Sequence, residues 1–175
     1  MGSWIQRSKD TLKEIIHSVK KENEGLTVRV CFIGYRDVQD NPRFEIFQFS
    51  EDLDSAVKFI TSMRATGGGD APEDVQGGLN HALKMPWTEG SIKQLFLICD
   101  APGHGKDICD GHDNHSNGSP DGHRIQSQMQ EFAKKRINFN IVRVNSSVDK
   151  MIGVMRANFD SLERKIIVTD LQNSV

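Results

Sequence analysis

The stretch that decides the fold of this 175-residue chain is Thr66–Asp74, which reads TGGGDAPED. Its three consecutive glycines free the backbone to turn tightly, and Asp70 places a hard oxygen donor at the tip of that turn. An acid in this position needs a cation, a hydrogen-bond donor or solvent. Pro72 suits the first position of a helix, and the two acids after it suit a first turn, where the helix dipole favours negative charge. We therefore expect a glycine turn that leads into a helix over residues 72–85.

A second acid follows an apolar run further along the chain. The run is LFLIC, residues 95–99, and Asp100 comes directly after it. A short run of this kind is typical of a buried parallel strand, which we expect over residues 94–99. The carboxyl ends of such strands form the usual ligand edge of open α/β folds. We therefore expect Asp70 and Asp100 to come close together at that edge.

Helical and strand-like segments alternate along the rest of the chain. Apolar residues at helical or strand spacing define these segments, and turn residues such as Gly25 and Asn41-Pro42 separate them. Ser50 is expected to cap the second helix, and the strand before it is expected at an edge of the sheet, where antiparallel pairing is open to it. The expected helices are 3–21, 51–63, 72–85, 123–136 and 149–158, and the expected strands are 26–35, 44–49, 94–99, 138–144 and 165–169. This alternation predicts an α/β domain with a mainly parallel sheet.

The composition excludes several classes of protein. The formal net charge is −2, so no overall basic field favours nucleic acid as a partner. No apolar run approaches the ~18 residues of a membrane-spanning helix. The first residues lead into a mixed polar helix rather than a secretory leader, and the three cysteines form no recognisable disulfide framework. We therefore expect a cytoplasmic protein that binds neither nucleic acid nor membranes.

The glycine turn and the strand that ends in Asp100-Ala101-Pro102 together resemble the von Willebrand factor A domain. Within that family the match is to the subgroup found in hemicentin-like proteins and beside atypical alpha-kinase domains. The resemblance covers about residues 1–170 and implies a single domain over residues 1–175. It also implies a Rossmann-like fold with helices on both faces of a sheet whose strand order is 3-2-1-4-5-6.

The start of the chain resembles the middle of that family's pattern. Residues 1–5, MGSWI, resemble the residues just after the family's first metal motif, Asp-x-Ser/Thr-Gly-Ser. The resemblance therefore implies an N-terminally truncated domain that lacks its central first strand. The strands that would flank it, at 26–35 and 94–99, would expose unpaired backbone groups unless they pair with each other or another chain donates a strand.

The resemblance also implies the remnant of a metal-ion-dependent adhesion site. Asp70 and Asp100 are the remaining ligands, and Thr66 is a further candidate. Gly69 occupies the place where many members have a ligand threonine, so Asp70 would substitute for it. Oxygen ligands suit Mg²⁺, which we expect to bind weakly or not at all without the first motif, and whose open position would accept an acidic side chain from a protein partner. From the residues alone, Asp70 could instead cap the next helix and Asp100 its own loop.

Two further groups of residues belong to the same expected edge. Arg36 and Asp37 end the strand at 26–35 and either line the metal face or form an ion pair that fixes the exit of the strand. In the histidine-rich loop at 100–122, Cys109 and the two histidines that follow it have a spacing that suits zinc, although a solvated loop explains it equally simply. The residues that we expect to shape a partner-binding surface are Gly68, Gly69, His104, His112 and His115.

The sequence supports three functional interpretations. The first is a non-catalytic protein-binding module of the von Willebrand factor A type. The second is a regulatory fragment of an atypical alpha-kinase whose catalytic domain lies outside this chain. The third and weakest is a metallohydrolase that uses the histidine-rich loop. No nucleophile–base pair, phosphate-binding loop or nucleophile elbow is recognisable, so we expect that the chain is not an enzyme.

Overall fold

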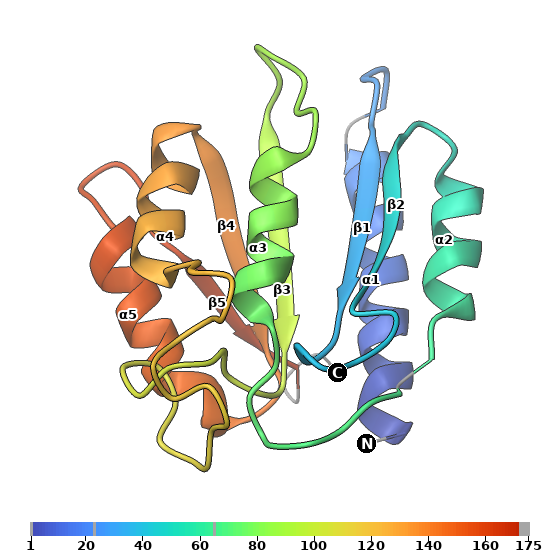
Figure 1. Ribbon diagram of the computed structural model, residues 1–175. Helices are drawn as coiled ribbons and strands as arrows, with labels where there is room; N and C mark the ends of the chain where they lie inside the picture. The colour runs from blue at the N-terminus through green and yellow to red at the C-terminus, as the bar shows by residue number, and fades with distance from the viewer. Residues whose placement is uncertain (1, 23, 65, 172–175) are drawn as a thin grey trace.

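The computed structural model of the chain describes residues 2–22, 24–64 and 66–171, and Figure 1 shows how its elements are arranged. The helices are α1 (Gly2–Glu22), α2 (Leu53–Ser62), α3 (Val75–Lys84), α4 (Ile125–Lys134) and α5 (Asp149–Phe159), with a 3-10 turn, η1 (Ser146–Val148), before the last. The strands are β1 (Val30–Tyr35), β2 (Phe44–Ser50), β3 (Lys93–Cys99), β4 (Ile137–Arg143) and β5 (Ile167–Asp170). Each expected helix and strand is present, with ends that differ by a few residues. None of the described helices is long and apolar enough to cross a bilayer.

Three strands form a parallel sheet in the order β3-β4-β5. In its registers Leu95 lies opposite Phe139, and Ile141 lies opposite Val168. Helices flank this sheet, with α3 and α4 on the side nearer the viewer in Figure 1. The structure therefore confirms the mixed α/β fold with a parallel sheet and flanking helices.

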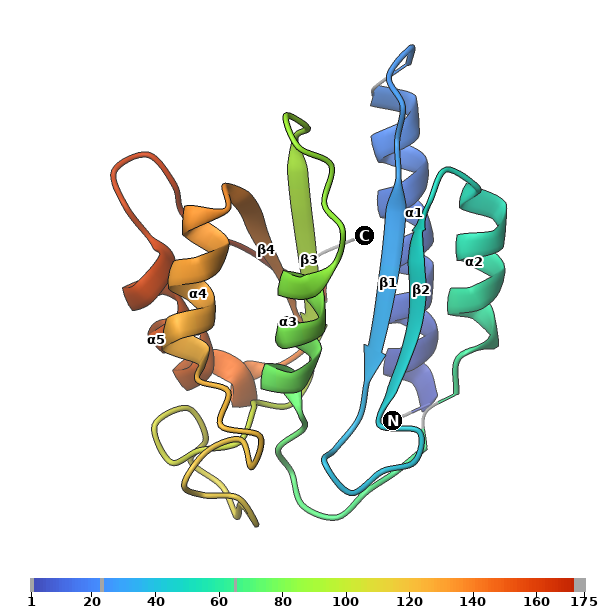
Figure 2. The ribbon, with the colours of Figure 1, turned by 45° about the horizontal axis from the view of Figure 1, so that its top comes forward.

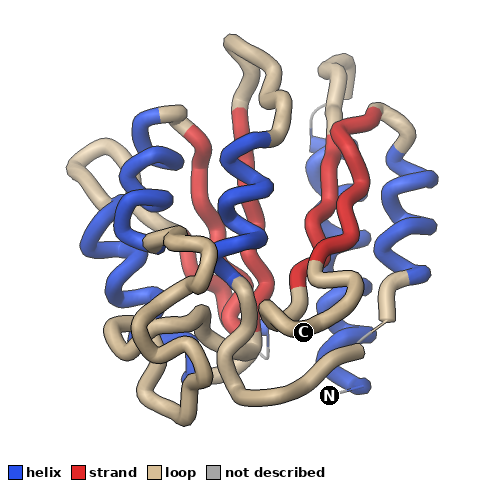
Figure 3. Tube along the Cα trace, viewed as in Figure 1, coloured by secondary structure: helices blue, strands red, loops and turns tan. Residues whose placement is uncertain are grey.

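The remaining two strands form a separate antiparallel hairpin. β1 pairs with β2, with Tyr35 opposite Phe44 and Ile33 opposite Ile46. Within the described residues no backbone ladder joins β1 to β3. Figures 1, 2 and 3 nevertheless all place β1 beside β3, with α1 behind the hairpin and α3 on the opposite side. The sheet is thus divided between its second and third strands along the chain.

The division corrects one prediction and bears out another. Residues 26–35 were expected as a buried parallel strand, but the strand begins at Val30, its only described partner is antiparallel, and each of its residues is half-buried. The physical reason is that the strand lies beside the core of the parallel sheet and not within it, so that Ile33 and Tyr35 contact that core only as partly buried residues. The expectation that residues 44–49 form an edge strand is confirmed, and its pairing is antiparallel.

The hydrophobic core lies around the parallel sheet. Phe139 at the centre of β4 packs edge-to-face against Phe132 of α4 and Phe159 of α5, with ring centroids 5.2 and 6.0 Å apart. All three rings are buried, as are most apolar side chains of α3, α4 and α5. Ile33 and Tyr35 of the hairpin pack against this core only as partly buried residues. The parallel half therefore supplies most of the buried apolar surface.

Two helices begin later than the sequence suggests. The N-cap of α2 is Asp52, whose side chain accepts the Ser55 N–H at 2.9 Å, and not Ser50. The N-cap of α3 is Asp74, so Pro72 and the acids after it do not form a first helical turn. The reason is a tertiary contact, because the backbone at residue 73 forms a parallel bridge with the loop that follows β3.

Candidate functional site

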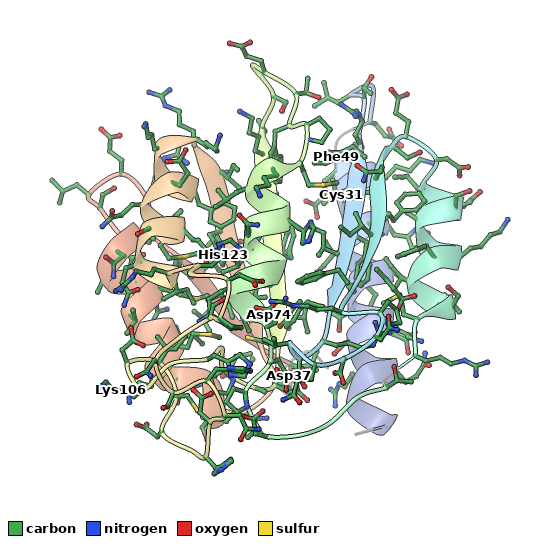
Figure 4. The ribbon with its side chains drawn as sticks, in the orientation of Figure 1. Cys31, Asp37, Phe49, Asp74, Lys106 and His123 are labelled. Atoms are coloured by element: carbon green, nitrogen blue, oxygen red, sulfur yellow. The ribbon has the colours of Figure 1, made fainter. Side chains whose placement is uncertain are left out.

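Three loops meet at the carboxyl ends of β1 and β3. They are the loop after β1 at 36–43, the glycine turn at 66–74, and the long loop after β3 at 100–124. The Glu73 N–H donates to the carbonyl of Pro102 at 2.9 Å. The Asp74 N–H donates to the carbonyl of Arg36 at 3.2 Å, and Figure 4 shows Asp37 and Asp74 at this edge. The backbone of the glycine turn is thus bound to the segments that follow both strands.

A buried imidazole lies at the centre of this edge. The side chain of His104 is 0 % exposed, and each ring nitrogen contacts one carboxylate. Its Nε2 lies 2.8 Å from Asp37 Oδ1, and its Nδ1 lies 2.8 Å from Asp113 Oδ1. Burial by itself lowers the pKa of His104, but the hydrogen bonds to the two carboxylates outweigh it and raise that pKa above the ordinary value. The imidazole therefore joins the end of β1 to the loop after β3.

Asp113 organises the loop around this histidine. Its Oδ1 accepts the backbone N–H of His115 at 2.7 Å, and its Oδ2 accepts that of Gly105 at 2.7 Å. Burial opposes its ionisation, but these N–H groups and the His104 ring hold the pKa of Asp113 below its usual value. Its carboxylate is therefore charged at neutral pH and fixed in position.

Asp70 extends from the glycine turn into the same group. Its Oδ2 accepts the backbone N–H of Asn114 at 2.6 Å, whereas its Oδ1 is buried and has no hydrogen-bond partner. One ligand atom each from Asp70, His104 and Asp113 lie within 4.8 Å of one another. Among the described residues this is the one group of three or more histidine, cysteine or acidic side chains with such a spacing.

The two other proposed metal ligands lie outside this group. Asp100 is exposed at the end of β3, where its backbone carbonyl accepts hydrogen bonds from Asn145 at 2.9 Å and Ser147 at 2.7 Å. Thr66 is exposed in the glycine turn. Their role as ligands together with Asp70 remains a prediction. The alternative in which Asp70 caps the next helix is wrong, because Asp74 is that cap.

An acidic field surrounds Glu73. Its Oε2 is buried without a hydrogen-bond partner. Burial raises the pKa of Glu73 to about 7, and the negative charges of Asp37, Asp40 and Asp100 add to the effect. The ends of β1 and β3 therefore direct several carboxylates toward one place, which favours a cation there.

Asp74, at the start of α3, forms an ion pair with Arg43, which also contacts Asp121. It is 0 % exposed, and its Oδ1 accepts the Gly77 N–H at 2.9 Å. A Cβ at Gly77 would lie 1.9 Å from Asp74 Oδ2, so only glycine fits there. Arg43 donates to Asp74 at 2.7 Å and to Asp121 at 2.6 Å, which binds the loop after β1 to the loop before α4.

Arg36 and Asp37 have separate partners. The Arg36 guanidinium donates to Glu45, to the carbonyl of Pro42 at 2.8 Å and to that of Arg64 at 3.1 Å. Asp37 contacts His104 instead. The sequence-based alternative of an Arg36–Asp37 ion pair is therefore wrong, and Asp37 lines the site.

The glycine turn is shaped by its first glycine. Gly67 has a φ of +111°, and a Cβ there would lie 2.0 Å from Asp40 Oδ2. Gly68 and Gly69 are exposed beside it. The turn therefore exposes bare backbone at Gly68 and Gly69, and their role in binding a partner remains a prediction.

The histidines of the long loop have different surroundings. His112 is exposed, whereas His115 is half-buried, with its ring edge-on to that of His104 at a centroid distance of 4.9 Å and its Nε2 buried without a partner. Cys109 is buried. Among the described residues, the set of Cys109, His112 and His115 forms no group of potential ligands, so its zinc-like spacing does not correspond to a site.

Sequence reasoning missed two residues of this edge. Asp113 was not singled out, although it lies within the short polar run GHDNH. Glu73 was assigned to the first turn of a helix. A turn-forming aspartate directly before an asparagine was the available signal for Asp113. The burial of the Glu73 side chain, in contrast, depends on contacts that no local pattern reveals.

Comparison with known proteins identifies similar sequences. A family model described as the von Willebrand factor A domain matches residues 1–113. "Alpha-protein kinase vwkA" of Dictyostelium discoideum is 30% identical over 168 residues, which cover 95% of this chain and 26% of that protein. "Putative ariadne-like RING finger protein R811" of Acanthamoeba polyphaga mimivirus is 27% identical over 109 residues, which cover 61% of this chain and 10% of that protein. The matched region thus spans about a quarter of the first relative and a tenth of the second.

Proposed function

The chain belongs to the von Willebrand factor A family, and we propose that it is a protein-binding module that does not itself catalyse a reaction. The observation that supports this most is the meeting of three loops at the carboxyl edge, where an exposed glycine turn lies beside converging carboxylates. Loops held by a rigid α/β framework are the usual place for a binding surface.

We further propose that Mg²⁺ takes part in this binding. Asp70 and Asp100 would supply oxygen ligands, with Thr66 as an additional one. The unpartnered buried oxygen of Asp70 and the acidic field around Glu73 are compatible with a hard cation. When bound, Mg²⁺ would offer an open position to a carboxylate of the partner.

The divided sheet extends the same proposal. We propose that the place between β1 and β3 belongs to a further strand that carries the first metal motif of the family. Support comes from the missing ladder between β1 and β3 in the described residues and from the half-buried side chains of β1. A strand in this place would pair with both edges and bring ligands toward Asp70 and Asp100.

The test compares two acidic positions at opposite ends of β3. Binding of a library of Asp- and Glu-containing peptides is measured with Mg²⁺ and with a chelator, for the chain fused at its N-terminus to a strand that carries the family's first metal motif, and for D100N and E89Q of that fused form. Glu89 is exposed in the loop before β3, so E89Q changes the net charge equally. We expect Mg²⁺-dependent peptide binding that D100N abolishes and E89Q leaves unchanged. Binding that is indifferent to both the chelator and D100N would overturn the metal-dependent proposal.

A second candidate is a regulatory domain of an alpha-kinase. The match to a protein named as an alpha-protein kinase, over 95% of this chain, favours it. In this case adding the chain to a purified alpha-kinase catalytic domain should change the initial rate of phosphate transfer from labelled ATP. The chain alone should transfer none, and an unchanged rate in the mixture would count against this candidate.

A further inference from the structure

We propose that His104, Asp113 and Asp70 bind a divalent transition-metal ion, for which Zn²⁺ suits the donor set. The proposal shares Asp70 with the proposed magnesium site but uses neither Asp100 nor Thr66, so the two ions would compete for the Asp70 carboxylate. It therefore adds a site of different chemistry, in which a nitrogen ligand replaces the hydroxyl groups of a magnesium site. Imidazole together with carboxylates favours Zn²⁺ and its neighbours over Mg²⁺.

The distances among the three side chains suit one shared ion. Zn²⁺ binds nitrogen and carboxylate oxygen at about 2.0–2.2 Å, so neighbouring ligand atoms on one ion lie about 3–3.5 Å apart. His104 Nδ1 and Asp113 Oδ1 are 2.8 Å apart, and the ligand atoms of all three residues lie within 4.8 Å. Binding of an ion therefore requires the His104 ring to move slightly away from Asp113, whose carboxylate is held in place by its backbone N–H partners.

Asp37 orients the histidine for this role. Its carboxylate lies 2.8 Å from Nε2 of His104, so that nitrogen carries the proton and Nδ1 faces Asp113. Histidines that bind metals commonly donate their other N–H to a carboxylate, which fixes the tautomer and the orientation of the ring. Asp37 is thus a positioning residue, and the ligating nitrogen is Nδ1.

Two buried polar atoms beside the imidazole have no partner. Oδ1 of Asp70 is buried and unpaired, close to the charged carboxylate of Asp113. Nε2 of His115, whose ring contacts that of His104, is also buried and unpaired. Buried polar atoms without partners cost about 1–3 kcal/mol each, so they commonly indicate an ion or a water. A cation among these residues would pair with Asp70 and offset the repulsion between the two carboxylates.

The number of protons released when the metal binds follows from the two carboxylates that contact the His104 ring. Without a metal, the Asp37 and Asp113 carboxylates can both accept a hydrogen bond from the ring only if His104 is doubly protonated. An ion that binds Nδ1 displaces the proton there, so one proton is released for each ion bound. Affinity for the metal therefore falls as the pH falls.

The ion would join three segments that are distant in the sequence. Asp70 belongs to the glycine turn, His104 and Asp113 belong to the loop after β3, and Asp37 connects the ring to the end of β1. Because no backbone ladder joins β1 to β3 in the described residues, the ion would strengthen one of the few links between the two halves. The inferred role is therefore structural.

The experiment titrates chelator-treated protein with Zn²⁺ by calorimetry, and with Co²⁺ while recording its visible absorption. We expect one ion per chain, about one proton released in buffers of different ionisation enthalpy, and a Co²⁺ spectrum typical of nitrogen and oxygen ligands. D70N should weaken Zn²⁺ binding more than about tenfold, a loss that even outer partners of metal sites can cause. H104Q should abolish it.

Matched variants separate this site from others. H112A removes an exposed histidine of the same loop, and D100N removes a ligand of the proposed magnesium site; both should leave Zn²⁺ affinity and proton release unchanged. If H104Q fails to fold, D70N decides, since Asp70 is only half-buried and the replacement is isosteric. Absence of Zn²⁺ binding, or binding lost in H112A and retained in D70N, would overturn the proposal. Loss of Mg²⁺-dependent peptide binding in D100N, with Zn²⁺ affinity intact, would show that Zn²⁺ binding does not depend on the Asp100 side of the magnesium site and would support the proposal.

Discussion

The two halves of the sheet differ in how completely they are covered. Ile137, Phe139 and Ile141 of β4 are at most 1% exposed, whereas every residue of β1 is half-buried. β4 has a strand on each side and helices against it, but β1 has one described neighbour. β3 also has one described neighbour, yet its Leu97 and Cys99 are buried, because they belong to the core around the parallel sheet. Strand burial in this molecule therefore depends on access to that core and not on the apolar content of the strand.

The halves are joined by contacts other than strand pairing. At the carboxyl edge, His104 contacts Asp37, and the backbone at residue 73 bridges to the loop after β3. The hydroxyl of Tyr35 donates to the carbonyl of Ile98 at 3.4 Å. Tyr35 also packs against α3, where a Cβ at Gly78 would lie 3.1 Å from its ring. The hairpin is therefore attached mainly through polar contacts at one end and through α3.

The largest effect that we expect would come from filling the place between β1 and β3. Fusing an N-terminal β-strand of the family's pattern ahead of α1 should raise the free energy of unfolding by several kcal/mol, because each unpaired buried backbone group costs about 1–3 kcal/mol. Thermal and urea melts of the chain and the fused form measure the change. A fusion strand scrambled in sequence is the control. Equal, cooperative melting of the short and fused forms would show that the two halves already form a complete domain.

Truncating one aromatic side chain in each half tests the comparison directly. F139A should destabilise the chain by about 3–5 kcal/mol, since it leaves a cavity between two other rings in the buried half. F47A, in the half-buried hairpin, should cost clearly less. Urea unfolding gives both free energies. Equal losses would mean that the hairpin contributes to the core as strongly as the parallel sheet.

The protonation of Glu73, which lies where the two halves meet, should make the stability of the chain depend on pH. Because its folded pKa of about 7 lies above the ordinary value of 4.5, the folded state holds the proton more tightly. Protonated Glu73 therefore favours the folded state. This contribution to the free energy of unfolding is fully present below pH 4.5 and is lost as the pH rises through about 7. E73Q, measured with a chelator present, should therefore stabilise the chain at pH 8 and change little at pH 4.5.

The matched control for this prediction is E89Q, at an exposed position before β3. It changes the charge equally but should show no such dependence on pH. Denaturant melts at pH 4.5, 6 and 8 compare the three proteins. A stabilisation by E73Q that is the same at all three pH values would remove Glu73 from the acidic field at this edge.

The smallest expected effect concerns the helix beside the hairpin. D52A should cost about 1 kcal/mol, because it removes the N-cap of α2. S50A should cost less, since the Ser50 hydroxyl accepts one N–H from Asp52 at an exposed position. Chemical denaturation of both variants makes the comparison. A greater loss for S50A would return the cap to the position that the sequence first suggested.

Local pattern by itself determined the order and type of the elements. The apolar run at 95–99 identified β3, and the helices were recognised from their periodicity to within a few residues. These features depend on side chains that are neighbours along the chain, so a single sequence contains them. The strand at 44–49 was likewise recognised as an edge strand, because it is short and of mixed composition.

Only the tertiary structure decided which elements pair and where the site lies. β1 is as apolar as β3, yet it belongs to an antiparallel hairpin. The apolar residues of a strand do not specify which strand pairs with it. The start of α3 moved to Asp74 because the preceding residue bridges to the loop after β3. His104 lies 67 residues from Asp37 and 9 from Asp113, and no local periodicity connects such positions. The sequence placed an acid on a glycine turn; packing of distant loops gave that acid a histidine and a second carboxylate as neighbours.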